Sequence, residues 1–155
     1  MTAGLGPRLA EELSRYLPPD LPADLLAPLS ASEALTSQRL ADRAIRHLLP
    51  RALEGRSAAD AASRIRRLPE ITGAEVARTA QPALERIARA TTAPSDLIRA
   101  AAQVSGSLLR LEMPGGEEAG SMQLVSAVTR LAMAAIRSGT PASEVVTLLV
   151  SDPKP

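Results

Sequence analysis

The sequence predicts an all-α domain, and three observations lead to that prediction. No stretch of the 155 residues alternates apolar and polar side chains with the period of two that a half-buried strand needs. Apolar residues recur instead at helical spacing, and prolines and glycines interrupt them at intervals typical of helix lengths. We therefore expect one compact bundle of seven to eight helices over residues 1–155, with flexible ends at 1–6 and 151–155.

Prolines set the expected limits of the first two helices. Pro7 suits the first turn of a helix over about 7–17, because the N–H that proline lacks is unbonded in that turn anyway. Pro18-Pro19 would end this helix, since neither residue can continue it. A short second helix is expected over about 22–28.

The third expected helix begins at a capping box. Ser30 and Glu33 have the Ser-x-x-Glu spacing in which each side chain bonds the backbone N–H of the other residue. The helix would run to about Leu49, where Pro50 would kink or stop it, and Gly55 would close it.

Three further helices are expected in the middle of the chain. Ser57 with Asp60 forms a second capping box, and Thr72 with Glu75 forms a third. The next helix spans about 94–112 and repeats large aliphatic residues along one face.

The last third of the chain contains the most apolar segments. A glycine-rich stretch, Pro114–Ser121, predicts a loop. The helix after it, near 121–138, is apolar on most of its circumference, which is typical of the central helix of a bundle. A final helix begins at Thr140-Pro141 and carries more aliphatic residues than one buried face requires.

Composition excludes several kinds of site. The chain has no Cys, which rules out disulfides, a thiolate nucleophile and Cys-ligated metals, and its one His, His47, cannot form a His-pair metal motif. A single Tyr with no Trp or Phe provides no aromatic platform for single-stranded nucleic acid. We therefore predict no catalytic residues, no metal and no cofactor, and we do not expect an enzyme.

Charge and targeting signals favour a bacterial protein of the cytoplasm. The net charge is +1, and Arg supplies every basic residue except Lys154, a bias typical of a GC-rich coding genome. Arg8 and the neighbouring acids fall where a signal peptide would be apolar, and the longest apolar run, Leu131–Ile136, is far shorter than a membrane span. A cytoplasmic location without a membrane is the expectation.

Two sets of residues are candidates for a protein interface. Arg39, Arg43 and Arg46 follow one another at helical spacing and form a stripe, partly neutralised by Asp42. In the last helix, Val146 and Leu149 represent the aliphatic surplus, which is either core or interface. We expect these five residues (Arg39, Arg43, Arg46, Val146 and Leu149) to contact a partner protein or a second copy of the chain.

Residues 55–81 support an alternative function. The run Glu54–Ala62 resembles the first helix of many bacterial helix-turn-helix units, and a turn and second helix follow it. The connector contains Pro69 where a glycine is usual. The resemblance implies DNA binding, with contacts from Arg64, Arg66, Arg67 and Arg78.

The functional prediction is a non-catalytic protein-interaction, adaptor or regulatory domain. The alternative is a helix-turn-helix DNA-binding regulator, so nucleic acid is the second candidate partner. A small-molecule sensor with a ligand between helices is a third reading, and the scarcity of aromatic residues disfavours it.

Overall fold

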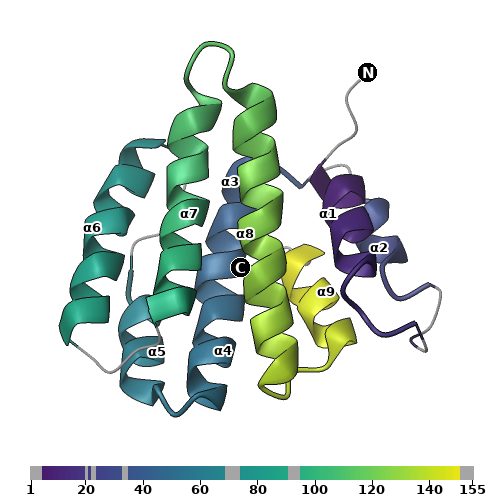
Figure 1. Ribbon diagram of the computed structural model, residues 1–155, viewed down its shortest axis with the longest axis horizontal. Helices are drawn as coiled ribbons and strands as arrows, with labels where there is room; N and C mark the ends of the chain where they lie inside the picture. Colours follow the sequence, from purple (N-terminus) through teal and green to yellow (C-terminus); the bar gives the residue numbers. More distant parts are fainter. Residues whose placement is uncertain are drawn as a thin grey trace, which may run out of the picture.

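The computed structural model describes residues 5–19, 21, 24–32, 35–68, 74–90 and 95–150, which contain helices and no strand (Figure 1). Because α3, the π-helical segment η1 and α4 follow one another without a break, the described residues form eight continuous helices. This confirms the expected all-α bundle. The elements are α1 (Leu5–Ser14), α2 (Ala27–Ser30), α3 (Ser37–Arg43), η1 (Ala44–Leu48), α4 (Leu49–Gly55), α5 (Ala59–Arg66), α6 (Ala74–Ala90), α7 (Ser95–Leu111), α8 (Glu117–Arg137) and α9 (Ala142–Val150).

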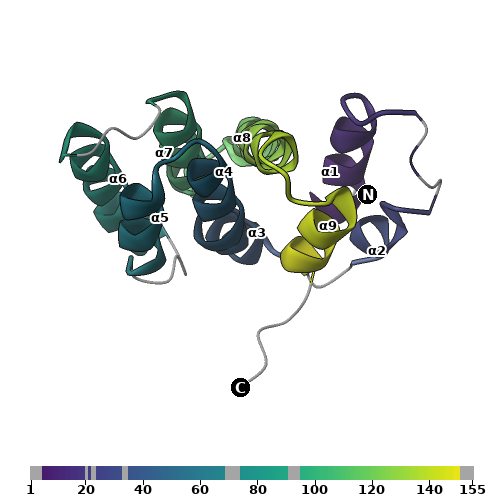
Figure 2. The ribbon, with the colours of Figure 1, turned by 90° about the horizontal axis from the view of Figure 1, so that it is seen from below.

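The helices form two layers around α8. Figure 2 shows α6, α7, α8 and α1 side by side in one layer, with α5, α4, α3, α9 and α2 in a second layer below them in this view. α8 packs most extensively against α7 and then against α1 and α4. Its residues Leu124, Val128 and Leu131 are fully buried in the apolar core that the described residues form. The expected central apolar helix is therefore confirmed.

α8 begins earlier than the sequence suggested, so the expected loop over Pro114–Ser121 is wrong from Glu117 onward. Glu117 and Glu118 occupy the first turn, where negative charge is stabilised by the helix dipole. Gly120 is inside the helix and faces Leu111 of α7, and a Cβ there would be too close to the Leu111 side chain. This glycine therefore serves close helix packing and not a turn.

α1 begins two residues earlier than expected. It spans Leu5–Ser14 where 7–17 was expected, so residues 5 and 6 are helical. Gly6 is buried, and a Cβ there would collide with the carbonyl oxygen of Leu29, the residue of α2 that packs against it. α2 is also shorter and later than the expected helix over 22–28.

The cap of the third helix was assigned to the wrong residue. Ser30 ends α2, Glu33 lies outside the described residues, and α3 begins at Ser37. The N-cap is Thr36, whose Oγ1 accepts a hydrogen bond from the backbone N–H of Arg39 at 3.1 Å. Thr, like Ser, accepts a hydrogen bond from an N–H of the first turn, so residue type alone did not distinguish Thr36 from Ser30.

Pro50 does not stop the helix, because the backbone widens just before it. Proline has no N–H for the hydrogen bond to the carbonyl four residues earlier. The segment before Pro50 is π-helical, and there the N–H of Leu49 bonds the carbonyl of Ala44, five residues earlier. The side chain of Arg51 donates from Nη1 to the carbonyl of His47 at 2.9 Å. The chain therefore continues as α4 to Gly55.

The expected capping boxes of the middle helices have different outcomes. α5 has Ala58 at its N-cap without a side-chain hydrogen bond, and Ser57 lies in the left-handed region with a φ of 60°, so the Ser57–Asp60 box is wrong. Thr72 lies outside the described residues. α7 agrees closely with the helix expected over 94–112.

Candidate functional site

The arginine stripe of α3 and η1 is not a free surface. Arg43 is 5% exposed and donates from Nη1 to the carbonyl oxygen of Leu149 in the last turn of α9, at 2.8 Å. Arg46 pairs with Asp42 at 3.0 Å and donates to the carbonyl oxygen of Leu68, just after α5, at 3.1 Å. Two of the three side chains of the expected interface stripe therefore bind backbone carbonyls at the ends of other helices. Arg43 is corrected to a buried contact within the chain, whereas an interface role of Arg39 and Arg46 stays a prediction.

The aliphatic candidates of α9 belong to the core. Val146 is 4% exposed and Leu149 is fully buried. Neither side chain is available to a partner, so the expectation of an interface on these two residues is also corrected. The aliphatic surplus of the last helix is used within the chain, against α2, α3, η1 and α8.

The arginines of the DNA-binding alternative lie in different environments. Arg64 pairs with Asp60 within α5, at 3.3 Å, and Arg66 pairs with Glu54 of α4. Arg67 and Arg78 are exposed. The connector 69–73 lies outside the described residues, and α6 packs mainly on α7, at the edge of the molecule (Figure 1).

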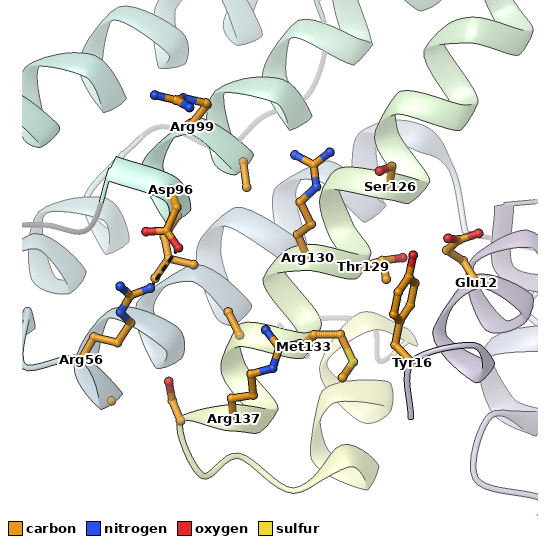
Figure 3. Close-up of a pocket in the computed structure, with 15 residues that line it drawn as sticks. Glu12, Tyr16, Arg56, Asp96, Arg99, Ser126, Thr129, Arg130, Met133 and Arg137 are labelled. Atoms are coloured by element: carbon orange, nitrogen blue, oxygen red, sulfur yellow. Dashed lines mark hydrogen bonds and ion pairs between the residues drawn. The ribbon is translucent and has the colours of Figure 1, made fainter. Parts of the chain in front are cut away.

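The structure instead places a set of cations around one open groove. We call it the α8 groove; its volume is about 790 Å³. α8 forms its floor, the start of α7 and the α4–α5 turn form one wall, and the end of α1 forms the other (Figure 3). The lining residues are Glu12, Tyr16, Gly55, Arg56, Asp96, Leu97, Arg99, Ala100, Ser126, Thr129, Arg130, Met133, Ala134, Arg137 and Ser138.

Helical spacing explains which α8 side chains face the groove. Ser126, Arg130, Met133 and Arg137 are three or four residues apart and therefore share one face of the helix. Ser126, Arg130 and Arg137 are exposed, whereas the opposite face of α8 is buried in the core. The helix thus presents two guanidinium groups two turns apart, with Met133 between them (Figure 3).

Close backbone packing fixes the lower end of the groove. A Cβ on Gly55 would collide with the side chain of Ser138, so α4 and the end of α8 meet at a position where only glycine fits. The hydroxyl of Ser138 donates to the carbonyl oxygen of Ala52 at 3.3 Å. This contact holds the α4–α5 turn, with Arg56, beside the end of α8.

Both acids of the α8 groove are already paired. Asp96 accepts a hydrogen bond from Arg56 at 3.0 Å, and Glu12 pairs with Arg15 at 3.3 Å. Slight burial raises the pKa of Asp96. The hydrogen bond and the charge of Arg56 lower it, and so do hydrogen bonds from backbone N–H groups at the start of α7. The net effect is a pKa below the ordinary value. Asp96 is therefore a stable carboxylate.

Three cations of the groove have no such partner. Arg130 donates to the neutral amide oxygen of Gln103 at 2.6 Å. Within the part of the chain that the structure describes, no carboxylate lies within ion-pair distance of Arg99, Arg130 or Arg137. The groove therefore carries an uncompensated positive charge.

The remaining lining supplies contact area. Tyr16 is 56% exposed on the α1 wall, and Met133 lies on the floor. The hydroxyl of Thr129 donates to the carbonyl of Val125 at 2.7 Å, and Ser138 is engaged as described. The groove can bind an anionic group and cover an apolar one.

His47 lies away from the α8 groove, on η1. Partial burial and the positive charge of Arg51 lower its pKa below 6.5, and Asp42 opposes them only in part, so the imidazole is neutral at pH 7. Among the residues that the structure describes, no cluster of three His, Asp or Glu side chains could hold a metal ion.

The sequence contained a signal for Arg130 and Arg137 that the hydropathy pattern obscured. The apolar majority of the helix near 121–138 indicates a core helix, yet two arginines seven residues apart in such a helix must share one exposed face. Arg99, Arg56 and Tyr16 join them only through the tertiary fold, and no local pattern indicates that contact.

No family model, curated protein or solved structure matches this chain. Among the described residues, α8 has the length and hydropathy of a membrane span, and more than half of its most apolar window is buried inside the protein, as in the core helix of a bundle.

Proposed function

We propose that this chain is a non-catalytic protein-interaction domain, of the adaptor or regulatory kind, that binds its partner in the α8 groove. The observation that carries the proposal is the groove itself, which is open and has a volume of about 790 Å³. Arg99, Arg130 and Arg137 line it, and none of the three has a carboxylate partner among the described residues. Arginine is enriched at protein interfaces, where its planar guanidinium forms paired hydrogen bonds to carboxylates.

The side chains around the groove support binding over catalysis. The lining contains no His, and two of its hydroxyls, on Thr129 and Ser138, donate to backbone carbonyls. Nucleophilic catalysis would need a hydroxyl beside a general base. Asp96 is held by Arg56 and Glu12 by Arg15, so neither carboxylate is placed to act as that base.

The proposed interface is the α8 groove and not the surface of the last helix that the sequence predicted. The class of function, a protein-interaction domain, is the same. An interface on Val146 and Leu149 would require exposed side chains, and both residues are buried. Tyr16, at 56% exposure, gives the groove an aromatic contact of the kind that contributes strongly to binding at protein interfaces.

The experiment is affinity capture from native lysate, run with and without nuclease, using the wild-type chain and two double variants. In the groove variant, Arg130 and Arg137 become Gln. In the control variant, Arg86 of α6 and Arg110 of α7 become Gln; both are exposed and lie outside the groove. We expect a stoichiometric protein that the wild-type and control chains retain and the groove variant loses.

The partner should then be placed by cross-linking from the groove. A cysteine at Ser126 gives a photo-cross-linker one attachment point, since the chain has no natural Cys. A partner that all three chains retain equally, or cross-links only from other faces, would overturn the proposal. Recovery of nucleic acid, with proteins lost on nuclease treatment, would favour the DNA-binding alternative.

A further inference from the structure

We infer that the occupant of the α8 groove is an acidic helix of a partner protein, with two carboxylates two helical turns apart and an apolar side chain between them. This inference rests on the proposed function, and it adds the chemistry of the partner to it. Three features of the groove lead to it: unpaired charge, the spacing of that charge, and the shape of the walls.

The unpaired charge selects a carboxylate-bearing ligand. Arg130 is held by the neutral amide oxygen of Gln103 at 2.6 Å. A carboxylate adds the attraction of opposite charges and can accept two parallel N–H bonds from one guanidinium, which a single amide oxygen cannot, so a carboxylate is the better partner for Arg130. Arg137 and Arg99 have no carboxylate partner among the described residues, so binding an acid there breaks no ion pair that the structure records.

The spacing of the charge selects a helix. Arg130 and Arg137 are seven residues apart on one face of α8, which places them about 10.5 Å apart along the helix axis. A ligand helix has the same rise, so acids at positions i and i+7 match both guanidinium groups at once. An extended strand places same-face side chains at multiples of about 6.7 Å, which do not match this distance.

The shape of the groove accommodates two turns of a helix. α8 forms the floor, and residues at the start of α7 and at the end of α1 line the two walls (Figure 3). Two turns of helix, about 10 Å across and 10.5 Å long, fill about 800 Å³, which is close to the groove volume of about 790 Å³. An apolar residue at i+3 or i+4 would then lie over Met133, a flexible side chain that adapts to varied apolar contacts.

The same groove disfavours a nucleic-acid strand. A single tyrosine offers one stacking surface, whereas sequence-independent strand binding stacks successive bases on several aromatic rings. Two carboxylates on a helix need no such row of stacking surfaces.

The test measures binding of two labelled helical peptides by fluorescence anisotropy. The matched peptide carries Glu at i and i+7 with Leu at i+3 and i+4 on an Ala background. The mismatched peptide has the same composition with the second Glu moved to i+5, which rotates that carboxylate to another side of the helix. We expect the wild-type chain to bind the matched peptide at least about tenfold more tightly, since one charged hydrogen bond accounts for that factor.

The groove and control variants show whether the arginines are responsible. Replacing both Arg130 and Arg137 with Gln should weaken binding of the matched peptide by about 100-fold, and replacing Arg86 and Arg110 with Gln should leave it within about threefold. All three chains should unfold at the same denaturant concentration, because the substituted side chains are exposed.

Other outcomes separate this inference from the proposed function. If the wild-type chain captures a protein that the groove variant loses, but both peptides bind equally or not at all, the acidic-helix inference is wrong and the interaction domain stands. If inorganic phosphate, ATP or a single-stranded oligonucleotide binds the groove more tightly than the matched peptide, the inference is overturned in favour of a phosphate ligand. If neither a protein nor a peptide depends on Arg130 and Arg137, both proposals fail.

Discussion

Arg43 of α3 bonds the carbonyl oxygen of Leu149, 106 residues later in the chain, and thereby ties the last helix to the centre of the bundle. The guanidinium donates at 2.8 Å and the side chain is almost fully buried. Carbonyl groups in the last turn of a helix have no partner within the helix, and the negative end of the helix dipole favours a cation there. Arg43 therefore satisfies a buried acceptor from outside α9.

Replacing Arg43 with Met should destabilise the protein by about 1–3 kcal/mol. Met preserves much of the aliphatic stem but leaves the Leu149 carbonyl without its donor, which costs the desolvation energy of that group. Urea unfolding measures the loss, and hydrogen exchange should show faster opening of α9. The control is Arg86→Met on the exposed side of α6, expected to change stability by less than about 0.5 kcal/mol. Equal stability of the two variants would show that the Arg43 bond contributes nothing.

Leu149→Ala should destabilise the chain by about 2–5 kcal/mol, because a fully buried leucine leaves a cavity. Polar replacement of both Val146 and Leu149 should unfold the protein, as seen by loss of the helical circular dichroism signal. Tyr16→Ala is the matched surface control, since Tyr16 is 56% exposed. A stable, folded Leu149 variant with a changed oligomeric state would restore the interface expected from the sequence.

Gly55→Ala should destabilise the protein by about 1–3 kcal/mol although alanine is the better helix former. The added Cβ would meet the side chain of Ser138, so either α4 or the end of α8 must shift. Gly106→Ala is the matched control, because a Cβ there meets only the flexible amide of Gln123, at 3.8 Å. That variant should be stabilised by up to about 1 kcal/mol.

A second substitution tests the cause of the Gly55 effect. Ser138→Gly removes the Cβ and hydroxyl that crowd the new methyl group, so the double variant should regain part of the lost stability. Additive effects of Gly55→Ala and Ser138→Gly would contradict the proposed collision. Because both residues line the α8 groove, peptide binding should follow the same order as stability.

The sequence was sufficient for the fold class and the central helix, because both depend on the spacing of apolar residues. It was insufficient for helix starts where two residues could serve as caps. Ser30 and Thr36 both fit an N-cap, and only the packed structure selects Thr36. Pro50 was expected to kink or stop its helix, yet a local π-helical widening, which no sequence pattern indicated, lets the chain continue.

The candidate site was harder to predict than the fold for a physical reason. A guanidinium on a helix surface and one that binds a distant carbonyl have the same local sequence, so Arg43 and Arg46 looked like interface residues. For the α8 groove, the sequence indicates only the floor, through two arginines in an apolar helix. Its walls come from α1, α4 and α7, which meet α8 only in the folded chain. Contacts between residues far apart in sequence decide both cases.

Acidification should weaken the fold through His47. Burial and the charge of Arg51 lower the pKa of the folded-state imidazole below 6.5, whereas the unfolded chain keeps the ordinary value. At pH values between these two pKa values, the unfolded state binds more protons than the folded state. The free energy of unfolding therefore falls as the pH decreases through 6.5, and at pH values well above 6.5 it does not depend on His47. One proton limits the slope to about 1.4 kcal/mol per pH unit.

Two measurements check this dependence. Urea unfolding between about pH 7.5 and pH 5.5, a range above the ordinary carboxylate values, should show a falling free energy of unfolding for the wild-type chain and a flatter profile for His47→Gln. The chain has a single His, so one imidazole NMR resonance reports its pKa directly. A folded-state pKa at or above 6.5, or identical slopes for the two proteins, would show that Asp42 outweighs burial and Arg51 at this position.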